Sequence, residues 1–143
     1  MTALPPRFFV TPDEIDRVMA AFYRRIRQHA QLGPVFTAHI GTDAAAWRTH
    51  EEKIGRFWRN AILREGVYDG RPMPVHRAAT DILPEHFPLW LALFDETLSA
   101  LLTPQAAAAW SALAHRIGAA FRMGVEEARR PADAVPRLRL SGG

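Results

Sequence analysis

Apolar and polar residues alternate along most of this chain with the period of an α-helix. Apolar residues recur at spacings of three and four within four stretches, Ile15–Ile26, Trp47–Ile62, Phe87–Leu101 and Trp110–Val125. The strict alternation that would indicate a β-strand is not evident anywhere in the sequence. The pattern therefore predicts an all-α protein.

Capping residues indicate where these helices begin. Thr11 is followed by Pro12, and Glu14 lies three residues after Thr11, which is the spacing of a capping box. We therefore expect the first helix to start at Pro12. The later helices are expected to open at Thr42 or Asp43, at Pro84 or Glu85, and at Thr103–Pro104.

Glycine and proline indicate where the first two helices end. Leu32–Gly33–Pro34 predicts the end of the first helix and leaves Phe36 in an irregular connection. Gly66 is expected to stop the second helix. Gly70 and two prolines then predict a loop over Tyr68–Pro74, followed by a short helix over Val75–Ala79.

The C-terminal end of the chain has a different composition. The last helix is expected to end near Arg129, and residues 131–143 are rich in proline, arginine and glycine without any period. We interpret residues 131–143 as a disordered tail, and residues 1–130 as one domain of ordinary size.

Composition excludes several classes of protein. The chain has 143 residues and no cysteine, so disulfides, zinc–thiolate sites, iron–sulfur clusters, thiol catalysis and covalent haem attachment are ruled out. No apolar run is long enough to span a membrane, and no leader sequence is evident, so we expect a cytoplasmic protein without a membrane partner. Phosphate-binding glycine loops, zinc-protease motifs and nucleophile elbows are also missing from the sequence.

Four residues carry candidate chemistry. Tyr23, His50 and Trp90 lie on the apolar faces of three predicted helices, and His76 lies after the proline-rich loop. Taken singly, each has a simpler interpretation as a core residue whose polar atom finds a partner. Taken together, they suit a flat cofactor such as haem, which needs one imidazole ligand, apolar walls and few polar groups on its open face.

A set of short stretches between Phe22 and Leu101 gives this interpretation more weight. They are Phe22–Tyr23, Leu32–Phe36, Ile40–Thr42, Trp47–His50, Lys53–Trp58, Tyr68–His76, Phe87–Leu91 and Phe94–Glu96. In order and spacing this set resembles the group III (P-type) truncated haemoglobins of bacteria. The resemblance implies the truncated globin fold, a two-over-two helical sandwich around haem b.

The resemblance also implies roles for individual residues. His76 matches the histidine that binds the haem iron, Tyr23 and Trp90 match the ligand-binding residues of the distal side, and His50 matches a distal histidine that gates ligand entry. Further cofactor contacts are implied at Phe36, Ile54, Phe57 and Trp58. Cationic and hydroxyl groups are needed for the haem propionates, and the candidates are Tyr68, Arg71 and Arg77.

The implied function is reversible binding of O₂, CO and NO. Two hydrogen-bond donors beside the ligand favour ligand retention, or redox processing of NO or peroxide with the help of a reductase, over transport. Asp69 and Asp81 are the acids nearest to His76 in sequence, and neither lies one helical turn away. We therefore expect at most modest peroxidase-like or NO dioxygenase-like activity. The protein is expected to be a monomer.

Two other functions remain open at this point. One is a helical interaction module without cofactor, in which Tyr23, His50, His76 and Trp90 are core residues. The other is nucleic-acid binding through Arg24, Arg25 and Arg27. The net charge of only +3 and the spread of the remaining arginines along the chain weigh against nucleic acid as a partner.

Overall fold

The structure is a computed structural model and describes residues 6–64 and 83–128. These residues form helices and contain no β-strand, which confirms the predicted all-α class. In chain order the elements are α1 (Pro12–Gln28), α2 (Leu32–Ile40), α3 (Ala44–Trp58), the π-helix η1 (Arg59–Leu63), α5 (His86–Leu101) and α6 (Pro104–Ala128).

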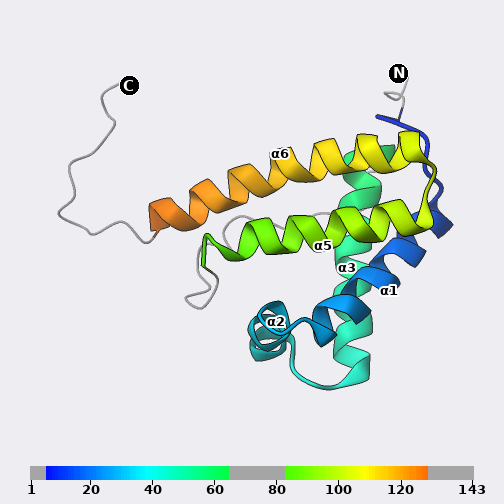
Figure 1. Ribbon diagram of the computed structural model, residues 1–143. Helices are drawn as coiled ribbons and strands as arrows, with labels where there is room; N and C mark the ends of the chain where they lie inside the picture. The colour runs from blue at the N-terminus through cyan, green and yellow to red at the C-terminus, as the bar shows by residue number, and fades with distance from the viewer. Residues whose placement is uncertain (1–5, 65–82, 129–143) are drawn as a thin grey trace, which may run out of the picture.

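The helices pack in two pairs, and one pair crosses over the other. α1 contacts α3 in one pair, and α5 contacts α6 in the other, where the two helices run antiparallel (Figure 1). α1 also packs against α5 and thereby joins the pairs, while α2 bridges the ends of α1 and α3. The arrangement is a two-over-two helical sandwich, as the resemblance implied.

The predicted capping residues hold the helix starts. The Thr11 hydroxyl accepts a hydrogen bond from the Glu14 N–H at 3.0 Å, and the Glu14 carboxylate accepts one from the Thr11 N–H at 2.8 Å. Asp43 accepts from the N–H of Ala46 at 3.3 Å, and Thr103 accepts from that of Ala106 at 3.2 Å. Each such cap contributes about 1 kcal/mol of helix stability.

The prediction for Phe36 is wrong, because Leu32, Gly33 and Pro34 open a helix instead of ending one. α1 stops earlier, at Gln28. His29 Nδ1 then accepts the N–H groups of Gln31 and Leu32, each at 3.1 Å. Pro34 occupies the third position of α2, where no N–H is needed for the intrahelical hydrogen bonds. Phe36 therefore lies on a helix.

Gly33 lets α2 lie close to the end of α1 at this junction. A Cβ atom at Gly33 would lie 3.0 Å from the main-chain oxygen of Arg27 and 3.2 Å from that of Ile26. Any larger residue would push α2 away from the end of α1.

The second predicted helix ends differently from the expectation. Beyond Trp58 it continues as the π-helix η1, and Arg64 then adopts the left-handed conformation with φ 61° and ψ 40°. The N-terminal segment before α1 covers this end. The main-chain N–H of Arg7 donates to the oxygen of Ile62 at 2.9 Å, and Arg7 Nε donates to the oxygen of Ala61 at 2.8 Å. Gly66, the predicted stop, lies outside the described residues.

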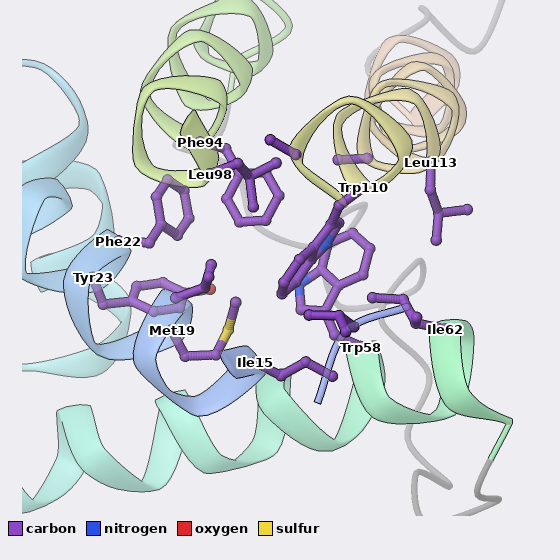
Figure 2. Packing of buried hydrophobic residues seen from close by; sticks show 14 of the residues in the cluster. Ile15, Met19, Phe22, Tyr23, Trp58, Ile62, Phe94, Leu98, Trp110 and Leu113 are labelled. Atoms are coloured by element: carbon purple, nitrogen blue, oxygen red, sulfur yellow. The ribbon is translucent and has the colours of Figure 1, made fainter. Parts of the chain in front are cut away.

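A cluster of aromatic rings forms the centre of the core and joins the two pairs of helices (Figure 2). The buried Phe94 ring of α5 stacks on Trp58 of α3 at a centroid distance of 5.7 Å. It also meets Phe22 of α1 edge-on at 4.8 Å and Trp110 of α6 at 5.5 Å. Such pairs each add roughly 0.5–1.5 kcal/mol to the free energy of burial.

Further predictions concern parts of the chain that the structure does not describe. The loop over Tyr68–Pro74, the short helix over Val75–Ala79, the tail over 131–143 and the end of the last helix near Arg129 fall in these parts, although α6 does run to Ala128. Among the helices that are described, none combines the length and apolar character needed to cross a membrane.

Candidate functional site

Three helices bring candidate residues together around Tyr23. The Tyr23 ring of α1 meets the His50 ring of α3 edge-on, with centroids 4.9 Å apart and ring planes at 90°. Phe36 of α2 lies 6.2 Å from the same ring. The start of α2 at Leu32 therefore places Phe36 beside Tyr23, although the sequence predicted an irregular connection there.

Trp90 of α5 joins this group through Phe22. The Phe22 ring lies 5.1 Å from Tyr23 and 5.2 Å from Trp90, with an edge-to-face geometry to both. Trp90 also stacks on the core residue Phe94 at 5.2 Å. We call the set Tyr23, Phe36, His50 and Trp90 the Tyr23 cluster.

The Tyr23 hydroxyl is the most informative group of the cluster. The side chain is only 2% exposed. Burial raises the pKa of this hydroxyl well above its ordinary value, and the nearby Glu51 carboxylate raises it further. Tyr23 therefore stays protonated at neutral pH and can act as a donor.

Half-exposed apolar side chains adjoin the Tyr23 cluster. Ile54 and Phe57 follow His50 along α3 at spacings of four and seven, which places all three on one face of the helix. Ile54, Phe57, Phe36 and Trp90 are each partly buried against the core. An apolar surface of this kind beside a buried donor fits one face of a flat cofactor.

Trp58 lies deeper than its implied role at the cofactor wall would suggest. It is almost fully buried between Phe94 and Trp110. Within the described part of the chain, neither the Trp58 nor the Trp110 Nε1–H has a hydrogen-bond partner.

The other implied cofactor residues fall outside the described residues. They are Tyr68, Arg71, His76 and Arg77. In residues 6–64 and 83–128, no three histidine, aspartate or glutamate side chains gather into a group that could hold a metal ion.

An ion pair next to the Tyr23 cluster was not predicted from the sequence. Glu51 of α3 lies 3.7 Å from the guanidinium of Arg27 on α1, and Arg27 lies over the Trp47 ring, 5.0 Å from its centroid. Burial raises the pKa of the Glu51 carboxyl, and this effect exceeds the opposing influence of Arg27, Arg24 and Arg48. No spacing rule could have revealed the pair, because its members lie on different helices.

A second polar group lies where α5 packs on α6. The Ser111 hydroxyl donates to the Asp95 carboxylate at 2.7 Å, and His115 Nε2 lies 2.8 Å from the other carboxylate oxygen. In a hydrolytic triad the histidine stands between the serine and the acid. Here the acid stands between them, so this group ties two helices together and provides no nucleophile.

Two of the three clustered arginines make contacts with other residues of the protein. Arg25 donates to the hydroxyl of the buried Thr97 at 3.1 Å, and Arg27 pairs with Glu51. Their positions give no support to a nucleic-acid interface on α1.

The two-over-two sandwich is the fold of the truncated globins. The chain is 38% identical over 90 residues to the group 3 truncated haemoglobin ctb of Campylobacter jejuni subsp. jejuni serotype O:2, a match that spans 63% of this chain and 71% of that protein. The crystal structure of a group III truncated haemoglobin from Campylobacter jejuni superposes with a TM-score of 0.79 and 32% identity, over 82% of this chain and 92% of that one. The chain belongs to the group III truncated haemoglobins. No family profile matches it.

Proposed function

We propose that this protein binds haem b against the Tyr23 cluster and retains a diatomic gas there. Membership of the truncated haemoglobins implies haem-based gas binding. The observation that carries the proposal for this chain is the buried Tyr23 side chain, whose hydroxyl has a raised pKa and whose ring meets that of His50 edge-on.

Residues of three helices would hold one face of the haem. Phe36, Ile54 and Phe57 offer apolar contact from α2 and α3, and Trp90 offers it from α5. His76 is proposed as the axial ligand of the iron, and Tyr68 and Arg71 as partners of the propionates. The haem supplies an iron centre that takes up O₂, CO or NO.

Tyr23 and Trp90 would act as donors to the bound gas. A hydrogen bond to a charged acceptor contributes about 1.5–3 kcal/mol. Each donor would therefore slow ligand release by roughly ten- to more than a hundredfold. Release this slow suits retention of the gas, or redox processing of NO or peroxide, better than transport. Repeated redox turnover would also require a reductase.

His50 would control access to the gas site. It is half-buried, and its ring meets the buried Tyr23 ring edge-on at 4.9 Å. A movement of this side chain would open a path to Tyr23 without disturbing the helix.

Absorption spectroscopy of the purified protein tests this function. We expect an intense Soret band that shifts on reduction and again on addition of CO, as for an imidazole-ligated haem. His76→Ala should abolish this spectrum or its five-coordinate ferrous form, and His39→Ala on the exposed face of α2 is the matched control. A colourless protein that also fails to take up added hemin would overturn the proposal and favour the cofactor-free interaction module.

A further inference from the structure

We propose that Arg27 and Glu51 form a positioning pair that holds Trp47 against Tyr23 and thereby fixes the direction in which Tyr23 donates to a bound gas. This inference rests on the proposed function of the Tyr23 cluster and assigns a role to residues outside that cluster.

Four residues face one another where α1 crosses α3, and we call this arrangement the square. They are Tyr23 and Arg27 on α1, and Trp47 and Glu51 on α3. Tyr23 and Arg27 are four residues apart on α1, so they lie one above the other on the same helix face. Trp47 and Glu51 have the same spacing on α3. Across the crossing, the Tyr23 and Trp47 rings are 6.3 Å apart, and Arg27 and Glu51 are 3.7 Å apart.

Trp47 is fixed from three sides within this square. Its Nε1–H donates to the main-chain oxygen of Gly41 at 2.8 Å, which sets the direction of the indole plane. Arg27 covers a face of the ring, at 5.0 Å from the centroid, and Tyr23 lies beside it. Gly41 has a φ of 99°, a conformation that glycine adopts readily and other residues rarely do. The position of the indole therefore follows from the turn before α3 and from the placement of Arg27.

Glu51 places Arg27, and it also immediately follows His50 on α3. The side chain of Glu51 is 16% exposed, while that of Arg27 is 41% exposed. An ion pair between groups of this kind contributes little net stability. Because burial raises the pKa of Glu51, its charge is retained in the folded protein at some expense of stability. Such a charge beside a candidate binding site is typical of a functional arrangement.

Glu51 also acts on Tyr23 through its charge. Burial is the main cause of the raised pKa of the Tyr23 hydroxyl, and the Glu51 carboxylate raises it further. Tyr23 is a protonated donor at neutral pH in either case, so the effect of the pair on a bound gas comes from the position of Tyr23.

The first test is a double-mutant cycle between Glu51→Gln and Tyr23→Phe in the haem-bound protein. We expect Glu51→Gln alone to broaden or split the CO stretching band and to speed O₂ dissociation about two- to tenfold. In the Tyr23→Phe background the same change should have no further effect, because the donor is already absent. An equal effect in both backgrounds would overturn the proposal, since Glu51 would then act independently of Tyr23.

Further variants separate positioning from a general loss of helix contact. Arg27→Met should reproduce the effect of Glu51→Gln, and Arg27→Lys, which keeps the charge, should restore much of the parent CO band. The exposed ion pair between Arg122 and Glu126 on α6, at 3.3 Å, is the matched control. Removal of this ion pair by Arg122→Met should leave the CO stretching band and the O₂ dissociation rate unchanged. If Arg122→Met altered them as much as Arg27→Met does, the role of the pair would not be specific.

A third measurement needs no haem. The chain has two tyrosines, so in a Tyr68→Phe background the phenolate absorbance reports Tyr23 alone. We expect Tyr23 in the haem-free chain to ionise well above the ordinary tyrosine range, and Glu51→Gln to shift this ionisation to lower pH. No shift would overturn the link between Glu51 and Tyr23. Failure to bind haem would overturn the proposed function and would leave this titration intact as a separate result.

Discussion

Replacement of Tyr23 by phenylalanine separates its role as a donor from its role in packing. The Tyr23 ring contacts Phe22, Phe36, Trp47 and His50, and phenylalanine keeps the ring that makes these contacts. The change removes only the hydroxyl of a side chain that is 2% exposed. Ligand retention should therefore change far more than stability.

The expected magnitudes follow from the two environments of the hydroxyl. Without ligand, a neutral hydroxyl contributes at most the net value of one ordinary hydrogen bond, about 0.5–1.5 kcal/mol, so the stability of the haem-free protein should stay close to that of the parent. With a gas bound, the lost hydrogen bond removes about 1.5–3 kcal/mol. O₂ dissociation should therefore become roughly ten- to more than a hundredfold faster.

Stopped-flow displacement of O₂ by CO would measure the dissociation rate, and urea unfolding of the haem-free chain would measure stability. An unchanged dissociation rate would show that Tyr23 does not contact the ligand. A marked loss of stability would show instead that the hydroxyl has a structural partner in the folded chain. Either result would refute the argument from burial.

Further predictions concern Trp90, His50, Glu51 and Phe94. Trp90→Phe keeps the stacking on Phe94 but loses the N–H donor, so O₂ dissociation should speed up in the same displacement assay. His50→Ala should change the O₂ association rate, measured by flash photolysis, more than the dissociation rate; the reverse would make His50 a stabiliser of the ligand. The native state holds the Glu51 proton more tightly than the unfolded chain, because the pKa of Glu51 is raised. The unfolding free energy of the parent should therefore fall, relative to that of Glu51→Gln, as pH rises above the ordinary carboxyl range. Denaturant unfolding of both proteins across a pH series would measure this difference, and a difference that does not change with pH would contradict the prediction. Phe94→Ala should cost about 3–5 kcal/mol in denaturant unfolding, whereas Phe9→Ala, at a side chain 94% exposed, should cost almost nothing.

The sequence predicted most of the fold because its helix signals are local. The cap at Thr11, the cap at Asp43 and the Thr103–Pro104 pair each act within one helical turn, and the structure confirms all three. The prediction failed at α2, where Gly33 and Pro34 are breakers by composition. Their effect depends on His29, whose ring nitrogen accepts the first N–H groups of the new helix. Residue composition alone does not reveal a histidine in that role.

The residues of the site likewise divide into those that local spacing reveals and those that depend on tertiary contacts. Tyr23, His50 and Trp90 stand out in the sequence because polar-capable residues on apolar faces are visible from spacing alone. The Arg27–Glu51 pair does not, since its contact depends on the angle at which α1 crosses α3. The shift in the Glu51 pKa has the same origin, because burial at the crossing is a tertiary property.

The contacts of Arg7 tie the beginning of the chain to a helix end more than fifty residues later. The carbonyl oxygens of Ala61 and Ile62 accept hydrogen bonds from Arg7, so the N-terminal segment completes the end of η1. During synthesis Arg7 leaves the ribosome long before Ala61, and this helix end stays open until the chain closes on itself. A recombinant form that begins at α1 would keep every helix in its sequence and would still lack the partner of those two carbonyl groups. An affinity tag is therefore better placed after the last helix than immediately before Arg7.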